Sequence, residues 1–223
     1  MNIPDKMNAV ITANIVEYSK LSKPEAERLL KDLHELFENL DEVRTNLNST
    51  FSIKRGESVQ VEIDKPEEAL VIALLLKTKV NMMAPGNSTS KNPEVDVRIA
   101  IGIGTINARR DRVNESAGEA YYNSGRTLDQ MKNSKRFIAV RTGDPGTDSE
   151  LETEMRLLEV IMSGWKRTSA EVVYWKLWDK YENQIAAELK ISQPAVNHRK
   201  KTAGWHGIDS LLQRYYQLIG QLR

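Results

Sequence analysis

A cluster of polar and basic side chains near the end of the sequence has the residue types that contact nucleic acids. Side-chain amides hydrogen-bond to base edges, and Gln and Asn can pair bidentately with adenine. Basic side chains suit phosphate groups, which position a protein on a duplex without specifying sequence. The candidate DNA-contacting residues are Gln193, Asn197, His198, Arg199, Lys200 and Lys201. The stretch from Lys190 to Ile208 contains no Asp or Glu, so positive charge is concentrated around them.

The residues that lead into this cluster have the spacing of a helix-turn-helix. Such a motif needs a small residue where its helices cross, apolar residues under the turn, and an N-cap for the second helix. Ala186 fits the crossing, Leu189 and Ile191 flank the turn, Ser192 is a suitable N-cap, and Val196 is expected to point into the core. The second helix is therefore predicted over residues 193–202. Gln193, Asn197 and His198 would face bases, and the three basic residues would meet phosphates.

Lys190 departs from this pattern, because most such motifs place a glycine in the left-handed turn. The alternative is a helical dimerisation domain with a solvated basic face, and the agreement of charge with spacing favours DNA binding. Four tryptophans in this part are expected to be core or dimer contacts. The last helix has an apolar stripe that could pair with a second copy, which would suit a palindromic site. The stripe consists of Leu211, Leu212, Tyr215, Leu218 and Ile219.

The preceding residues predict the elements of an α/β domain. Strands are expected at 8–16, at 49–55 and 58–64 as a hairpin around Gly56 and Glu57, at 95–106 and at 136–142. Helices are expected after an N-cap at Ser22, from 64–66 to about Met83, and over 118–133. Residues 84–94 are a polar loop and 143–150 a linker by composition. In the 95–106 strand, glycines remove side chains where a backbone or ligand comes close.

Composition supports a soluble protein of two parts. The 223 residues are 40% hydrophobic and 28% charged and include no cysteine, which excludes disulfides and thiolate metal sites. Residues 1–150 carry 21 Lys and Arg against 23 Asp and Glu, whereas residues 190–223 carry six against one. We expect an α/β domain over 1–145 and a helical domain over 150–223. No apolar run has the roughly 20 residues that cross a bilayer, and the default location is the cytoplasm.

Four segments of the first part resemble, in order and spacing, the motifs of class III nucleotide cyclases. They are ANIVEYS, RGES, VRIAIGIG and GEAYYNSGRTLDQM, within about residues 8–140. The combination with a C-terminal helix-turn-helix also resembles the SatD family of bacterial proteins. The resemblance implies a ferredoxin-like βαββαβ domain with an added αβ unit.

The same resemblance implies a ligand site whose catalytic residues are altered. In the cyclase family two carboxylates hold two metal ions. These positions fall on Asn14, a neutral amide, and on Glu57, which is one methylene longer than the family's aspartate. Arg126 matches the arginine that stabilises the transition state. The family's asparagine position is Tyr122, with Asn123 one residue out of phase, a rotation of about 100 degrees. Weak metal binding and no efficient catalysis are expected.

These observations together predict a DNA-binding transcription regulator with a degenerate cyclase-like domain. Double-stranded DNA and a second copy of the chain are the expected partners, and a nucleotide is a possible ligand at Asn14, Glu57 and Arg126. The sequence leaves the identity of any cofactor unknown. One alternative is a metal-dependent nucleotide cyclase or nucleotidyltransferase that tolerates Asn14 and Glu57. Others are a plain α/β domain in which Asn14 and Arg126 serve packing or surface charge, and an interaction protein whose parts both serve assembly.

Overall fold

The computed structural model describes residues 6–40, 47–54, 57–83, 95–108, 117–134 and 136–222. Gly56 of the expected hairpin turn and the expected loop 84–94 lie outside these residues. The described chain is α/β, with a five-stranded mixed sheet in the order β2-β3-β1-β4-β7. The strands are β1 (Asn8–Val16), β2 (Ser49–Lys54), β3 (Ser58–Ile63), β4 (Asp96–Gly104) and β7 (Ile138–Arg141), and β5 (Ile106–Ala108) pairs with β6 (Ala117–Gly118).

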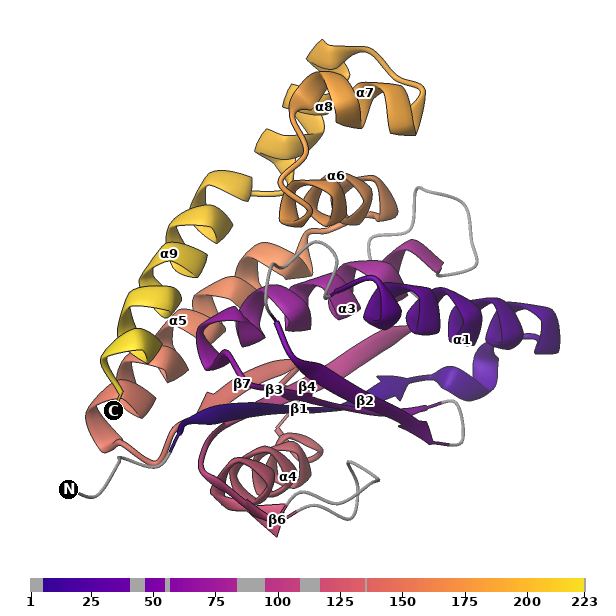
Figure 1. The fold of residues 1–223 in the computed structure, drawn as a ribbon. Helices are drawn as coiled ribbons and strands as arrows, with labels where there is room; N and C mark the ends of the chain where they lie inside the picture. Colours follow the sequence, from indigo (N-terminus) through magenta and orange to yellow (C-terminus); the bar gives the residue numbers. More distant parts are fainter. Residues whose placement is uncertain are drawn as a thin grey trace.

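Helices cover both faces and one edge of this sheet (Figure 1). They are α1 (Lys23–Glu38), α3 (Ala69–Met83), α4 (Glu119–Met131), α5 (Pro145–Ser163), α6 (Arg167–Leu177), α7 (Glu182–Leu189), α8 (Gln193–Thr202) and α9 (Trp205–Gln221). Short 3-10 turns, η1 (Tyr18–Lys20) and η2 (Pro66–Glu68), precede α1 and α3. No helix in the described ranges combines the length and the apolar character needed to cross a membrane.

β1 lies at the centre of the sheet and separates an apolar face from a polar one. It runs antiparallel to β3 and β4, and β7 runs parallel to β4. Ala9, Ile11, Ala13 and Ile15 are buried in the main core, as the period of two requires. On the other face, the hydroxyl of Thr12 lies 2.9 Å from the hydroxyl of Ser124 in α4. Figure 1 shows α1 and α3 on one side of the sheet and α4 on the other.

Local signals place the helices of the apolar face. α1 begins at the expected N-cap: the backbone N–H of Ser22 donates to Glu25 at 2.8 Å, and Pro24 lies in the first turn. Four residues of α1 at helical spacing, Leu29, Leu33, Leu36 and Phe37, are buried. α3 is buried on nearly all sides because it lies between the sheet and α6.

Gly102 allows α4 to lie directly on β4. A Cβ atom at this position would lie 2.2 Å from the carbonyl oxygen of Ala120 and 2.3 Å from the backbone nitrogen of Ser124. Real Cβ atoms do not approach backbone so closely, so any side chain would push the helix off the strand. The expectation that the glycines of this strand permit a close backbone approach is therefore confirmed at Gly102.

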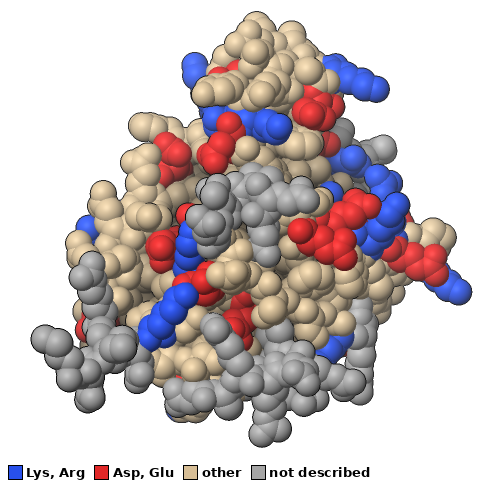
Figure 2. Space-filling view, in the orientation of Figure 1, with Lys and Arg blue, Asp and Glu red and all other residues tan. Residues whose placement is uncertain are grey.

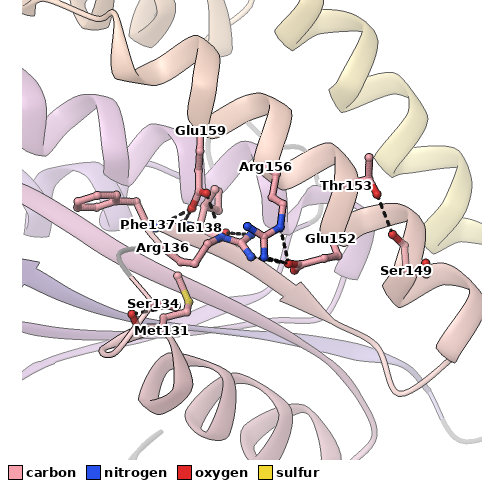
Figure 3. A network of polar contacts seen from close by, with 10 residues as sticks. All are labelled: Met131, Ser134, Arg136, Phe137, Ile138, Ser149, Glu152, Thr153, Arg156 and Glu159. Atoms are coloured by element: carbon pink, nitrogen blue, oxygen red, sulfur yellow. Dashed lines mark hydrogen bonds and ion pairs between the residues drawn. The ribbon is translucent and has the colours of Figure 1, made fainter.

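The sheet edge is joined to α5 by an ionic network (Figure 3). Arg136 is 8% exposed, and its guanidinium donates to Glu159 at 2.9 Å and to Glu152 at 2.6 Å. The other carboxylate oxygen of Glu159 accepts the backbone N–H groups of Phe137, at 2.7 Å, and Ile138, at 3.0 Å. This carboxylate therefore satisfies donors at the start of the edge strand β7, which α5 covers.

The prediction of a linker at 143–150 is wrong. Asp144 is the N-cap of α5, its carboxylate accepts the backbone N–H of Thr147 at 2.7 Å, and Pro145 occupies the first turn. Pro, Gly and Asp are frequent in linkers, but the same residues begin a helix when they stand at its N-terminus. The expected boundary between the two parts thus lies within one continuous helix.

The last helix packs against its own chain. Tyr215 is fully buried and its hydroxyl donates to the carbonyl oxygen of Pro66 at 3.1 Å. Leu218 and Ile219 are also buried, in the same core as the sheet residues Ile99 and Ile101. The apolar stripe that we expected to pair with a second copy is therefore largely used within the chain, because η2, α3 and α5 pack against α9.

The contact at Gly102 predicts a large difference between two glycine substitutions. Gly102→Ala should lower the free energy of unfolding by about 2 kcal/mol or more, because overpacking against backbone cannot relax. Gly125→Ala is the matched control, since nothing lies within 4 Å of a Cβ there. In the middle of α4 it should raise stability by up to about 1 kcal/mol through helix propensity. Urea unfolding monitored by circular dichroism gives both values, and equal effects would show that α4 does not lie on β4 this closely.

Candidate functional site

α7 and α8 form a small unit with a core of its own. Val172 of α6, Ile185 of α7 and Val196 of α8 are completely buried against one another. Ala186 and Leu189 pack against this cluster. The prediction that Val196 points inward is confirmed, and α7 and α8 are consequently held at a fixed angle by three side chains and their neighbours.

The turn between these helices is made by Lys190, Ile191 and Ser192. Lys190 has φ 52° and ψ 46°, so it occupies the left-handed region where a glycine is usual. The backbone N–H of Ile191 donates to the carbonyl oxygen of Ala186 at 3.0 Å, which closes the end of α7. Ser192 is the N-cap of α8, and its hydroxyl accepts the N–H of Ala195 at 3.3 Å. The expected cap is confirmed.

The outward side of α8 carries three of the predicted DNA-contacting residues. Asn197, His198 and Lys201 lie about 100 to 200 degrees around the helix from the buried Val196. His198 and Lys201 are exposed and Asn197 is half-buried. Gln193, at the first position of α8, is also exposed. These four side chains are accessible from one side of the α7–α8 unit.

The other two predicted residues, Arg199 and Lys200, point toward neighbouring helices. They lie within about 60 degrees of Val196. Arg199 forms an ion pair with Glu171 of α6 at 3.1 Å, and Lys200 forms one with Glu182 at the start of α7. The hydrogen bond from Lys200 is the main reason why the pKa of Glu182 is lowered. Both basic side chains therefore hold α8 to α6 and α7. Their partners lie 28 and 18 residues away in the sequence, beyond the reach of a local pattern.

The α7–α8 unit retains positive charge after this pairing. Residues 166–204 carry eight Lys and Arg against four Asp and Glu. In Figure 2 the visible face of the lobe formed by α7 and α8 is largely uncharged, and Lys and Arg project from its two sides. Acidic and basic side chains are interspersed over the visible face of the α/β part.

On the sheet, two of the three predicted ligand-binding positions lie together. Asn14, near the end of β1, pairs in register with Ser58 of β3 and Arg98 of β4. The carbonyl oxygen of Glu57 accepts the N–H of Ile15 at 2.7 Å, so Glu57 adjoins the same end of β1. Among the described residues, no set of three or more His, Asp or Glu side chains is arranged to hold a metal ion.

Arg126, the third predicted ligand-binding position, is exposed on α4. Its guanidinium donates to the hydroxyl of Tyr122 and lies 5.6 Å from the centre of that ring. Among the described residues, no hydrogen bond or ion pair joins Arg126 to Asn14 or Glu57. Asn123 is buried and donates to the carbonyl oxygen of Ile103 at 2.9 Å, so its amide fixes α4 to β4. Asn123 follows Tyr122 by one residue, and this step of about 100 degrees turns its side chain away from the solvent-facing side that carries Tyr122 and Arg126.

The ion pair between Lys200 and Glu182 predicts a pH-dependent effect on stability. The pKa of Glu182 is lowered in the folded chain, so the pair stabilises at neutral pH and the contribution is lost as pH falls through that pKa. Lys200→Ala should lower stability by about 0.5 to 1 kcal/mol at pH 7. The difference from the unmodified protein should shrink as pH falls through the lowered pKa of Glu182 and should vanish once this carboxylate is protonated. Lys201→Ala is the matched control. Thermal unfolding followed across pH checks both variants, and equal losses for both would contradict the pairing.

Comparison with known proteins gives a likeness at the level of structure. No protein-family model matches the chain, and no curated protein matches it. Among solved structures, the chain is similar to a bacterial light-regulated adenylyl cyclase, with a TM-score of 0.41 and 12% sequence identity. The likeness covers 60% of this chain and 74% of the cyclase chain. It is a distant likeness of structure, and it carries no activity over to this protein.

Proposed function

We propose that this protein is a DNA-binding transcription regulator in which α7, the turn at Lys190–Ser192 and α8 form a helix-turn-helix. The observation that carries the proposal is the division of α8 into two sides. Val196 anchors the helix in a small core, and Asn197, His198 and Lys201 project away from it. A recognition helix needs this arrangement, because side chains must reach base edges while the helix stays attached to its partner.

Within this proposal, Gln193, Asn197 and His198 face base edges and Lys201 contacts phosphate. Arg199 and Lys200 have a different role from the one their charge suggests, since both are paired within the chain. Their ion pairs hold α8 in position and lessen the repulsion among the basic side chains of this helix. Phosphate contacts would then come from Lys201 and other lysines of the unit, such as Lys190, which is exposed in the turn.

We further propose that the α/β part is a degenerate cyclase-like domain, as in the SatD family that the sequence resembles, and that it serves as a ligand-binding or dimerisation domain. The adjacency of Asn14 and Glu57 supports a remnant of a nucleotide site at the end of β1. Arg126 does not contribute to this remnant site in the proposal, because it faces solvent and pairs with Tyr122. A homodimer would use a surface other than the buried stripe of α9.

DNA binding is tested by comparing two lysines of equal charge. The protein should bind duplex DNA with an affinity that falls steeply as salt rises. Lys201→Ala should weaken binding to random-sequence DNA and reduce the salt slope by about one, because one phosphate contact is lost. Lys132→Ala, which removes an exposed lysine at the C-cap of α4, should leave both the affinity and the salt slope unchanged. Fluorescence anisotropy of labelled DNA over a range of salt concentrations measures the affinity and its salt slope. Absence of binding at low salt, or identical behaviour of the two variants, would refute the proposal.

Base recognition requires a separate measurement on a preferred site, obtained by selection from a random duplex pool. Asn197→Ala should cost about 1 to 3 kcal/mol on that site and far less on random DNA, because a base contact is lost while phosphate contacts remain. Circular dichroism confirms that the variant is folded. Equal losses on both DNAs would assign Asn197 to positioning rather than to base recognition.

The alternative function is a metal-dependent nucleotide cyclase or nucleotidyltransferase, favoured by the adjacency of Asn14 and Glu57. We predict no useful rate of product formation, because Asn14 supplies no charge for a metal ion and Arg126 is engaged with Tyr122. The measurement is pyrophosphate release from ATP or GTP with manganese. Robust release that Glu57→Ala abolishes would establish the enzyme instead.

A further inference from the structure

One side of α5 carries two exposed aliphatic side chains in a regular row. Leu157 is 62% exposed and Val160 is 71% exposed, and neither carries a charge. Single exposed aliphatic residues are common on protein surfaces. These two, however, continue a row that includes Thr153 and the C-cap Gly164, at steps of four, three and four residues. Such steps are those of the a and d positions through which two helices pack along each other. These four residues form the α5 stripe.

The α5 stripe lies on the opposite side of the helix from the core of the chain. The buried apolar residues of α5 are Leu151, Met155, Leu158 and Met162. Their centre is roughly 160 degrees around the helix from the centre of the stripe. The core of this chain therefore uses one side of α5, and a helix from outside the chain is needed to bury the other.

Charge is distributed unevenly along α5 and its end. Residues 144–155 contain five Asp and Glu and no Lys or Arg, whereas residues 156–167 contain three Lys and Arg and one Glu. Most of these charges are paired within the chain: Arg214 with Glu150, for example, and Arg167 with Glu171. Opposite charges are left near the two ends of the stripe, on Glu154 and Lys166.

Glu154 and Lys166 both lack an ionic partner within the described part of the chain. One carboxylate oxygen of Glu154 is buried without a hydrogen bond there. Burial and the Glu150 carboxylate raise the pKa of Glu154, and Arg214 opposes this effect. The exposed Lys166 makes no side-chain hydrogen bond or ion pair with the described residues. A surface that presents one unpaired acid and one unpaired base at opposite ends is complementary to a second copy of itself.

The orientation of the two copies follows from these charges. If two α5 helices run antiparallel about a point between Leu157 and Val160, Leu157 of each lies opposite Val160 of the other. Glu154 of each then lies opposite Ser163 of the other, within about one helical turn of Lys166. A parallel arrangement would instead place Glu154 beside Glu154. An antiparallel pair is also what a two-fold axis perpendicular to the helices generates.

We infer that the α5 stripe is the contact between two copies of this chain, with the α5 helices antiparallel across a two-fold axis and Glu154 of each copy paired with Lys166 of the other. The inference supplies the surface for the homodimer of the proposed function, but it does not depend on DNA binding. The α7–α8 units of the two copies would be related by the same axis, as recognition of a palindromic site requires.

Analytical ultracentrifugation of the full chain without DNA tests the apolar part of the contact. The unmodified protein should sediment as a dimer of 25.3 kDa chains. Val160→Glu should raise the dimer dissociation constant about 100-fold, because the residue occurs twice in the contact and burial of one such side chain is worth about tenfold. Tyr216→Glu is the matched control: it places the same charge on an exposed apolar position of α9 and should leave the dimer intact. Circular dichroism confirms that both variants are folded.

A second pair of variants tests the charge pairing. Lys166→Glu should weaken the dimer about tenfold, because two exposed ion pairs are replaced by repulsion. Adding Glu154→Gln to Lys166→Glu should restore most of the loss, since the repelling carboxylate is removed. This rescue requires that the two residues meet across the contact, because a local effect of Lys166 would not respond to residue 154.

Three outcomes would overturn the inference. One is a sedimenting mass of a single chain at every concentration. Another is a dimer that Val160→Glu and Tyr216→Glu leave equally stable, which would place the contact on a different surface. The third is a lack of rescue by Glu154→Gln, which would exclude the antiparallel pairing. DNA is absent from all these measurements, so a negative result would refute the α5 contact and leave DNA binding to its own test with Lys201→Ala.

Discussion

The carboxylate of Glu159 at the edge of the sheet is the contact on which the arrangement of the molecule depends. One of its oxygens accepts two backbone N–H groups at the start of β7, and the other pairs with the buried Arg136. A buried guanidinium is tolerated only when it is paired and hydrogen-bonded, so Glu159 and Glu152 are both needed. Because these acids lie on α5, satisfying Arg136 and satisfying the edge strand require the same helix in the same position.

The position of α5 in turn determines where the DNA-binding candidate lies. Arg214 of α9 pairs with Glu150 of α5 at 2.7 Å, and a Cβ atom on Gly204 would lie 2.8 Å from the Ile161 side chain of α5. The indole N–H of Trp165 donates to the carbonyl oxygen of Ala203 at the end of α8, at 2.9 Å. The α7–α8 unit is thus connected to the sheet through packed helices.

The two faces of the sheet have different physical roles. One face buries aliphatic side chains under α1 and α3 and supplies most of the stability through burial of apolar surface. On the other, α4 is held by a glycine contact and by polar links such as those between Thr12 and Ser124 and between Tyr121 and Glu62. On this face Asn14 is half-buried, and the adjoining Glu57 is exposed. A face of this kind can keep or lose a binding role without loss of the fold, because the core lies on the other side.

The sequence by itself determined the elements whose signals are local. The alternation of β1, the N-cap at Ser22 and the turn from Lys190 to Ser192 depend on neighbours within a few residues, so periodicity and capping chemistry predict them. The inward position of Val196 follows from the same helical period. The candidate site was predictable to this extent: its turn, its cap and its accessible residues Gln193, Asn197, His198 and Lys201.

Only the tertiary structure decided which long-range partner each group finds. Residues 143–150 have the composition of a linker, yet they begin α5, because the edge of the sheet offers that helix an apolar surface and a buried arginine. Arg199 and Lys200 have the same charge as Lys201, but Glu171 and Glu182 are brought beside them by the packing of α6 and α7. The apolar stripe of α9 suits a second copy as well as its own core. Local patterns specify that a face must be buried, and the packing of distant segments specifies what buries it.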